Sequence, residues 1–211
     1  MAYDLQEQEQ IAALKAWWEK YGTFVLTIVT LLLVAAAAYN GWRWYEQRQA
    51  HAAGLLYEQM LRAQAEKDTA KAREVAGTLL EKHGRTLYAA LAALQAARLY
   101  HDAGDWKAAA AQLRWVIDKS GRPELVATAR VRLAGVLLDA QQYEEALAAL
   151  AGEVPPSHAV QFADRRGDIL VAQGKVEQAR AAYEQALREA REDHPLRLLI
   201  QFKLDALPAA S

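Results

Sequence analysis

The longest hydrophobic stretch of the chain lies near its N-terminus, where residues 21–42 carry no charge. As a helix, these 22 residues rise about 33 Å, close to the roughly 30 Å hydrocarbon core of a bilayer. Nine large apolar side chains favour membrane insertion by about 4 kcal/mol, and no central lysine opposes them. The pattern predicts one transmembrane helix. The nine are Phe24, Val25, Leu26, Ile28, Val29, Leu31, Leu32, Leu33 and Val34.

Aromatic residues bracket this uncharged stretch at both ends. Four of the six tryptophans lie there, Trp17 and Trp18 before it and Trp42 and Trp44 at its end. Amphipathic rings collect at the headgroup level, so we expect these four residues to anchor the helix in the lipid bilayer. The alternative is a cleaved signal peptide. The length of the stretch, the acidic segment before it and the lack of a clear small-residue cleavage site disfavour that alternative.

The residues before the stretch have a helical period of their own. Ile11, Leu14, Trp18 and Tyr21 recur at spacings of three and four, which predicts a short amphipathic helix in the membrane interface. The expected organisation is a tail with this helix, a transmembrane helix and a helical domain, at residues 1–20, 21–42 and 43–211. Two lysines in the first flank and three arginines in the second do not orient the chain.

Small residues recur at a nearly constant interval after the stretch. Ala72, Ala109, Ala146 and Ala179 are spaced by 37, 37 and 33 residues. Small residues also lie twelve positions before the last three of them, and mostly larger apolar residues lie four positions after all of them. This register is typical of the 34-residue helix-turn-helix tetratricopeptide pattern, in which small residues let paired helices approach each other. The flanking residues are Ala97, Ala134 and Gly167, then Ala76, Leu113, Leu150 and Tyr183.

The ends of the repeats follow from turn residues. Gly104-Asp105, Gln141-Gln142 and Gly174-Lys175 precede the second helices of the three clear pairs. The middle pair loses its pattern after Leu150, where Gly152, Pro155 and Pro156 follow and predict an early helix end. Residues 195–207 open with proline and predict a terminal capping helix.

The first pair is degenerate. Met60 stands where a small residue is expected, and its first helix is expected to run from the uncharged stretch to Ala65. Ala dominates the composition and β-branched residues are few beyond the stretch, so the expected fold is all-α. A plain helical bundle with accidental periodicity is the alternative, but three units in phase favour the repeats.

Composition and motifs narrow the possible functions. Lys and Arg number 25 against 26 Asp and Glu, so no basic excess indicates nucleic acid as a partner. The chain has no cysteine, and no two of its five histidines lie within five residues. It has no glycine-rich phosphate loop and no nucleophile elbow. We therefore expect no catalytic residues, no metal and no cofactor.

One dense charged cluster, residues 164–168, lies on a predicted repeat helix. As a functional site, Asp164 and Asp168 could bind a partner or exchange protons. The alternative, which the sequence favours, places both aspartates on a solvated face with Arg165 and Arg166 as neighbours for charge balance.

The predicted concave side of the repeats is the candidate binding surface. First helices line that side in tetratricopeptide superhelices, so three residues of each clear first helix should point there. Their mixture of apolar and charged groups suits a partner's segment or a partly unfolded client protein. Changing Leu94 and Leu138 together to charged residues should then weaken partner capture without unfolding the domain. The residues are Leu94, Arg98, His101, Val131, Gly135, Leu138, Asp164, Asp168 and Val171.

Several motifs in order give the whole chain a family resemblance. They are Trp17-Trp18 before Gly22, residues 41–45 closing the stretch, Tyr57-Glu58, and residues 163–168 followed by Gly174 and Ala179. The chain resembles the ancillary subunit of the bacterial SecYEG translocon, a family of tetratricopeptide-like inner-membrane proteins.

The resemblance implies an orientation and partners. It implies a cytoplasmic N-terminus, a periplasmic repeat domain in the bacterial inner membrane, and association with the SecYEG translocon. It also implies contact with a membrane-tethered, prolyl-isomerase-like periplasmic chaperone and with emerging secreted proteins. Two alternatives remain open. One is an envelope scaffold that recruits enzymes of cell-wall or outer-membrane assembly, and the other is an enzyme or small-molecule carrier, for which the sequence offers no set of convergent polar groups.

Overall fold

The computed structural model of the chain describes residues 2–208, and every regular element in that part of the chain is a helix. This confirms the all-α prediction. The chain divides into two compact units, Met1–Gln49 and Ala50–Ser211. Residue 1 of the predicted tail and residues 209–211 of the predicted domain lie outside the described residues. The membrane boundaries at residues 20 and 42 stay a prediction.

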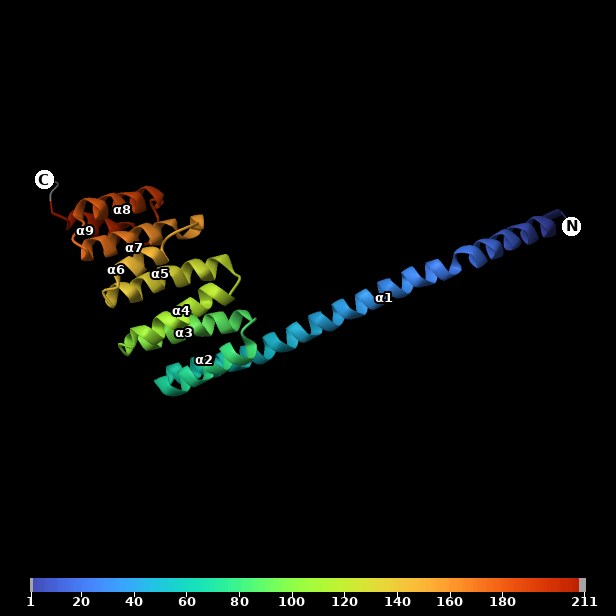
Figure 1. Ribbon diagram of the computed structural model, residues 1–211, viewed down its shortest axis with the longest axis horizontal. Helices are drawn as coiled ribbons and strands as arrows, with labels where there is room; N and C mark the ends of the chain where they lie inside the picture. Colours follow the sequence, from blue (N-terminus) through green and yellow to red (C-terminus); the bar gives the residue numbers. More distant parts are fainter. Residues whose placement is uncertain (1, 209–211) are drawn as a thin grey trace. The chain divides into compact units, whose positions relative to one another are not determined.

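The first unit consists of one helix, α1 (Ala2–Ala65), which continues into the second unit (Figure 1). The short amphipathic helix predicted before the uncharged stretch is therefore not a separate element, although its place in the membrane interface stays a prediction. The reason lies in the sequence, because no proline or helix-breaking turn separates the two segments. The predicted end of this helix at Ala65 is confirmed.

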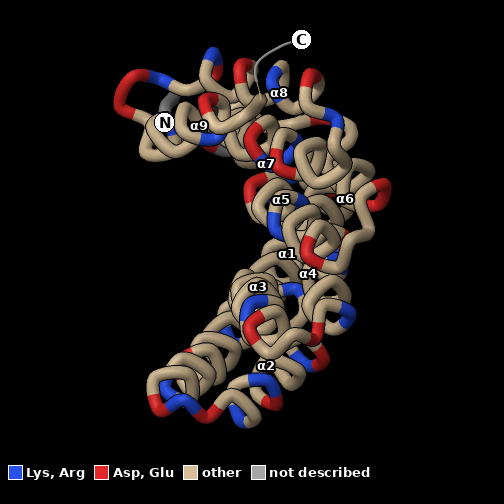
Figure 2. Tube along the Cα trace, turned by 90° about the vertical axis from the view of Figure 1, so that its left-hand side faces the viewer, with Lys and Arg blue, Asp and Glu red and all other residues tan. Residues whose placement is uncertain are grey.

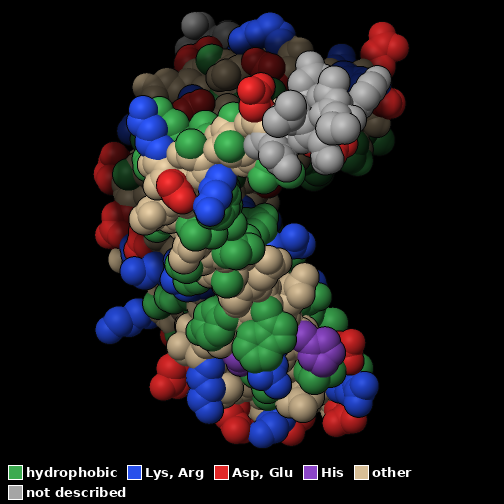
Figure 3. Space-filling view, turned by 90° about the vertical axis from the view of Figure 1, so that its right-hand side faces the viewer, with side chains coloured by type: hydrophobic (Ala, Val, Ile, Leu, Met, Phe, Trp, Pro, Cys, Tyr) green, Lys and Arg blue, Asp and Glu red, His purple; other side chains and the backbone are tan. Residues whose placement is uncertain are grey.

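The large apolar side chains in the uncharged part of α1, residues 21–42, are mostly not covered by protein. Within the described residues, α1 alone is long and apolar enough to cross a membrane, with a mean hydropathy of 2.1 over 18 residues, of which 6% are buried. Leu31, Leu32 and Leu33 are each about two-thirds exposed. Figure 3 shows hydrophobic side chains, in green, exposed on the surface that faces the viewer. A helix of this kind suits lipid better than water.

The second unit is a stack of helix pairs. The end of α1 packs with α2, and α3 with α4, α5 with α6 and α7 with α8 follow, before a final helix α9. Figure 2 shows this unit as a curve in which α3 and α5 lie on the inner side and α4 and α6 on the outer side. The bounds are α2 (Thr69–His83), α3 (Leu87–Asp102), α4 (Trp106–Lys119), α5 (Pro123–Asp139), α6 (Tyr143–Ala149), a 3-10 turn η1 (Pro156–His158), α7 (Ala159–Ala172), α8 (Val176–Glu189) and α9 (Arg197–Asp205).

The repeat register is visible in the helices themselves. The small residues Ala72, Ala109, Ala146 and Ala179 are each the fourth residue of a second helix, and each is 0% exposed. Met60, at the degenerate position, is 0% exposed as well. The predicted periodicity is thus confirmed as a packing register, in which helix pairs meet at fully buried small side chains.

One turn geometry joins the two helices of every pair. The residue at its centre has a left-handed backbone in all four copies, with φ of 61° at Lys67, 76° at Gly104, 58° at Gln141 and 73° at Gly174. The next residue donates its backbone N–H to a carbonyl five residues earlier, as Asp105 does to Tyr100 at 2.9 Å. The left-handed region favours glycine, so Gly104 and Gly174 suit this turn. The predicted turns are confirmed, and Lys67 belongs to a fourth turn that the sequence did not indicate.

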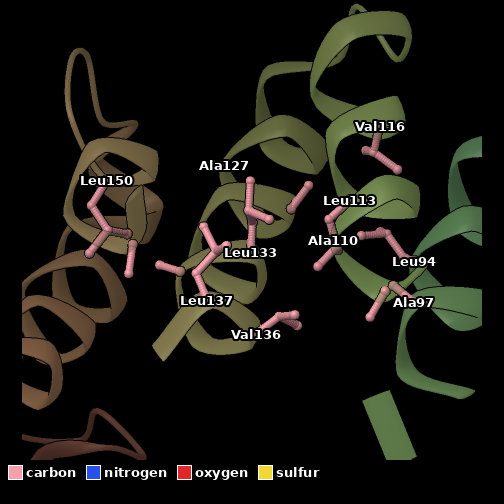
Figure 4. Close-up of a cluster of buried hydrophobic side chains, with 14 of the residues drawn as sticks. Leu94, Ala97, Ala110, Leu113, Val116, Ala127, Leu133, Val136, Leu137 and Leu150 are labelled. Atoms are coloured by element: carbon pink, nitrogen blue, oxygen red, sulfur yellow. The ribbon is translucent and has the colours of Figure 1, made fainter. Parts of the chain in front are cut away.

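The main core lies between the second and third pairs. Leu94 and Ala97 of α3, Leu113 of α4 and Leu137 of α5 belong to one buried cluster, in which Figure 4 shows the side chains between the helices. Helix α6 ends at Ala149, which confirms the early helix end that the glycine and prolines after Leu150 predicted. Arg130 holds the loop that follows α6, because its guanidinium donates to the carbonyls of residues 149, 151 and 153.

Candidate partner-binding surface

The inner side of the repeat domain is hollowed between α3, α5 and α7. A groove of about 320 Å³ lies there, with contributions from all three first helices and from Leu113 of α4. Its floor is apolar, because Leu94, Leu113 and Val136 are each at most 6% exposed and come together at its base. The helix pairs position these residues, since a first helix presents one face to its partner helix and the next face to the inner side.

The structure brings four of the predicted concave residues to this groove. Leu94, Arg98 and His101 of α3 line it, and Gly135 of α5 lines it opposite them. Whether these residues bind a partner stays a prediction.

Three other residues predicted for the concave side lie outside the groove lining. Val131 and Leu138 are partly buried and pack against the main core. Val171 is 42% exposed. The face of α5 that lines the groove is shifted by about one residue from the predicted face. This shift explains why Val131 and Leu138 are partly buried, because each neighbour along a helix points about 100° away.

Leu94 is a core residue as well as a groove residue. It is 5% exposed and belongs to the buried cluster between α3, α4 and α5. A charge at this position would be buried without a partner, and such a charge costs several kcal/mol. The expectation that Leu94 and Leu138 can be charged without unfolding the domain is therefore wrong, and mutations that test the groove must leave Leu94 in place.

Three arginines surround the groove, two of which the sequence did not indicate as site residues. Arg132 of α5 and Arg165 of α7 line it together with Arg98. Arg132 and Arg165 occupy the same register position one repeat apart, 33 residues, which is the signal that could have found them. The Arg165 guanidinium lies beside Gly135, where an added Cβ would be in ordinary van der Waals contact with the guanidinium carbon at 3.5 Å.

The acidic groups near the groove are few and mostly engaged. Asp139 faces His101, with 2.6 Å between Asp139 Oδ2 and His101 Nε2. Asp102 lies 3.7 Å from the Nε of Arg98, in an exposed pair that adds little stability. No described residue forms a hydrogen bond or ion pair with Arg132. Arg165 lies 3.3 Å from Asp168. Of the three arginines, Arg132 is therefore the one that no described carboxylate pairs, and the groove combines an apolar floor with this single unpaired cation.

Asp164 and Asp168 lie beneath the terminal helix, and Arg165, which lines the groove, donates to Asp168 Oδ2 at 3.3 Å. The terminal helix α9 covers them, and its Lys203 Nζ donates to Asp164 Oδ1 at 2.7 Å and to Asp168 Oδ1 at 2.8 Å. Tyr183 of α8 donates its hydroxyl to Asp168 at 2.9 Å. Asp164 is 8% exposed, so the interpretation of these aspartates as members of a solvated face is wrong. They hold α9 in place, and the predicted capping helix is confirmed in that position.

Burial governs the electrostatics of this network. It raises the pKa of Asp164 above its ordinary value, although the hydrogen bond from Lys203 acts in the opposite direction. Burial and the neighbouring Asp168 also raise the pKa of Tyr183, which keeps its hydroxyl protonated as a donor. Gly167 makes the contact possible, because a Cβ there would lie 2.3 Å from Tyr183 Cε1. Residues 163–168, part of the family resemblance, thus contain the two aspartates that bind Lys203 of the terminal helix.

The four predicted anchor residues lie on α1. The side chains of Trp17, Trp18, Trp42 and Trp44 are each about half exposed. Trp17 packs against the ring of Tyr21, with 5.7 Å between centroids, and the Arg48 guanidinium lies 4.6 Å from the Trp44 ring. Such clusters at both ends of an apolar stretch are typical of membrane interfaces, and their contact with lipid stays a prediction.

Comparison with known proteins agrees with this architecture. Residues 15–209 match a family described as a tetratricopeptide repeat-like domain. A protein of Neisseria gonorrhoeae named ancillary SecYEG translocon subunit is 32% identical over 211 residues, which cover 98% of this chain and 100% of that protein. The chain belongs to this family. Members from Escherichia coli and Haemophilus influenzae are each 28% identical, over 86% and 88% of this chain and 87% and 91% of their own length.

Solved structures similar to this member of the ancillary subunit family share its fold alone. Two MamA structures, a double mutant and a form from Desulfovibrio magneticus, each superpose with a TM-score of 0.54. They are 18% and 19% identical and cover 72% of this chain, and 92% and 85% of their own chains. The predicted family resemblance and repeat fold are confirmed.

Proposed function

We propose that this chain is a non-catalytic interaction subunit that associates with the SecYEG translocon in a bacterial inner membrane. The observation that carries the proposal is the match to named ancillary translocon subunits, which extends over whole chains and includes the apolar part of α1. The exposed leucines of α1 support a membrane anchor. The groove formed by the first helices of successive repeats supports protein binding.

The proposal has a finer part. The N-terminus lies in the cytoplasm and the repeat domain in the periplasm, where the groove meets a membrane-tethered, prolyl-isomerase-like chaperone and emerging secreted proteins. What supports this part is the family membership together with the shape of the groove, which is open, apolar at its floor and lined by arginines at its rim. A shallow groove of this kind suits segments of unfolded chains better than a small-molecule ligand.

Photo-cross-linking from the anchor tests the first part. A photoreactive amino acid at Thr27 or Ala38, each on the exposed surface of α1, should form adducts with translocon subunits in native membranes. The same residue at Lys119, in the repeat domain, serves as the control for chance collisions in the membrane. Adducts from α1 with enzymes of cell-wall or outer-membrane assembly, and none with the translocon, would support the envelope scaffold instead.

Cysteine labelling tests the orientation. Because the chain has no cysteine, single cysteines at Glu7 and Lys119 report on the two sides of the membrane without a background signal. With a membrane-impermeant maleimide and a permeabilised outer membrane, we expect Lys119→Cys to be labelled and Glu7→Cys to be protected until the inner membrane is lysed. The reverse pattern would contradict the proposed orientation.

A further inference from the structure

The terminal helix α9 presents an exposed apolar face. Leu198, Leu199 and Phe202 are 65%, 48% and 61% exposed, whereas Ile200 on the opposite face is 0% exposed. Leu198 and Phe202 are the two most exposed large apolar side chains among the described residues of the repeat domain, and they lie one helical turn apart. The last helix of a repeat stack ordinarily turns a polar face outward, so an apolar outer face indicates an interaction site.

The place of α9 in the stack indicates what kind of element suits this face. Each first helix of the repeats packs against the second helix before it and against its own second helix, as α5 does against α4 and α6. Helix α9 packs against α8 at the end of the stack, and no helix follows it among the described residues (Figure 1). It therefore stands in the position of a first helix, and its outer face is one that a second helix can cover.

Two carboxylates beside this face have no cation as a partner. Arg191 lies 3.4 Å from Asp193, and Arg197 donates to two backbone carbonyls at the end of α8. Glu192 and Asp205 form no ion pair with a described residue. A hollow of about 330 Å³ beside Leu198 is lined by Glu192 and Asp193, together with Arg197. The surroundings of the apolar face thus favour a cationic group over an anionic one.

We infer that the outer face of α9 binds an amphipathic helix of another protein, in which lysine or arginine flanks a stripe of large apolar residues. The stripe packs on Leu198, Leu199 and Phe202, and the basic side chains pair with Glu192 and Asp205 at the two ends of the face. The bound helix completes a fifth helix pair. This surface lies outside the groove between α3, α5 and α7, so the inference goes beyond the proposed function.

Two other occupants suit the charges of this face less well. An antiparallel two-fold contact between the α9 helices of two copies would place Asp205 of one copy near Glu192 of the other, and like charges repel. Anionic lipid headgroups would meet the same carboxylates, whereas helices that bind membrane surfaces carry lysine and arginine beside their apolar face.

A dye attached to α9 tests the inference in the full-length protein, held in nanodiscs of phosphatidylcholine. Because the chain has no cysteine, an environment-sensitive dye can be attached at Ala206→Cys, one turn after Phe202, and at Lys119→Cys as the control. The probe is a synthetic helix with a leucine stripe flanked by lysines. One matched peptide has glutamate in place of lysine, and another has the composition of the probe in scrambled order.

We expect the lysine-flanked helix to produce a saturable blue shift of the dye at Ala206→Cys and none at Lys119→Cys. The shift should require a higher peptide concentration as salt is added. No shift at Ala206→Cys, or an equal affinity for the glutamate or scrambled peptide, would overturn the inference.

Matched variants assign the binding to this face. Leu198→Ser together with Phe202→Ser should weaken binding at least tenfold, while Leu55→Ser, at another exposed leucine of the domain, should leave the affinity unchanged. Glu192→Gln together with Asp205→Asn should weaken it about fivefold. Circular dichroism should show unchanged helix content in all of them, because every replaced side chain is exposed. An equal loss in Leu55→Ser, or full affinity in either double variant, would contradict the assignment.

Two further outcomes would assign the face to another occupant and sink the inference. One is quenching of the dye at Ala206→Cys by lipids brominated in their acyl chains, which would place the face in the bilayer. The other is a dimer in neutral detergent, detected by analytical ultracentrifugation, that Leu198→Ser together with Phe202→Ser abolishes. The anchor cross-links to the translocon do not depend on α9, so their failure together with intact peptide binding would contradict the proposed function alone.

Discussion

The third and fourth helix pairs place one register position in opposite environments. One repeat, 33 residues, separates Gly135 from Asp168. On α5, Gly135 and Arg132 face an open groove, whereas on α7, Asp168 lies beneath α9 and binds Lys203. The difference teaches that the repeat sets the direction of a side chain, and that the element packed over it decides whether its charge is structural or available to a partner.

The largest expected effect on stability comes from removing the lysine that pairs with the aspartates beneath α9. Lys203→Met leaves Asp164 beneath α9 without its nearest cation and leaves Asp168 with Arg165 alone, and a buried charge without its partner is strongly destabilising. We expect the free energy of unfolding to fall by about 3 kcal/mol, as measured by denaturation of the full-length protein in detergent and followed by circular dichroism. Lys107→Met, at an exposed position of α4, is the control and should change it little. A change of less than about 1 kcal/mol in Lys203→Met would show that α9 is held by its apolar contacts alone.

A smaller loss should follow from Gly167→Ala. The added methyl group would lie 2.3 Å from the Tyr183 ring, so α7 and α8 must separate, and overpacking of this kind costs about 2 kcal/mol. Gly77→Ala is the matched control, because no atom lies within 4 Å of that Cβ and alanine is the better helix former. The same denaturation experiment should show destabilisation in the first variant and slight stabilisation in the second. Equal effects in both variants would contradict the close approach of Tyr183.

Lowering the pH should change the contribution of Asp164, on the covered side of this comparison, to the free energy of unfolding. Burial raises the pKa of this carboxyl above its ordinary value of 3.8, so the folded chain binds the proton more tightly than the unfolded chain. The stability that this group contributes therefore falls as pH rises from 3.8 through the raised pKa, and is recovered on acidification. We expect the difference in unfolding free energy between the wild type and Asp164→Asn to shift toward the wild type as the pH is lowered. A shift toward the variant would mean that the ion pair with Lys203 outweighs burial.

The smallest expected effect on stability is that of replacing an arginine of the open groove. Arg132 is exposed and pairs with no described residue, so Arg132→Gln should change the free energy of unfolding by less than about 0.5 kcal/mol. Thermal denaturation alongside Lys203→Met makes the contrast direct. A loss comparable to that of Lys203→Met would show that the groove arginines are structural, like the charges beneath α9.

Local sequence patterns were sufficient to predict most of the fold. The repeat interval, the turn residues and the prolines after Leu150 determine helix pairing and helix ends through contacts between near neighbours in the chain. The single helix of residues 2–65 was only partly predicted, because a change from amphipathic to apolar periodicity indicates a change of environment and does not require a break in the helix.

The surface was harder to predict than the fold. Lys203 lies 35 residues from Asp168 in the sequence, and no local pattern indicates that α9 folds back over α7. Leu94 was assigned to the surface because its register position faces inward, but α4 and α5 close over it and leave it 5% exposed. Arg132 was missed because the predicted face of α5 was rotated by one residue. Each error concerns contacts between elements, which periodicity within one element does not determine.

Cross-linking from the groove in native membranes tests the central claim most directly. A photoreactive amino acid in place of Arg132 should form adducts with protein partners, whereas the same residue in place of Arg188, an exposed residue of α8 outside the groove lining, should form few. Adducts at Arg132 that disappear when Gly135 is also replaced by leucine would agree with an open, partner-binding groove. Equal yields from the two positions, or adducts at Arg132 with lipid alone, would contradict it.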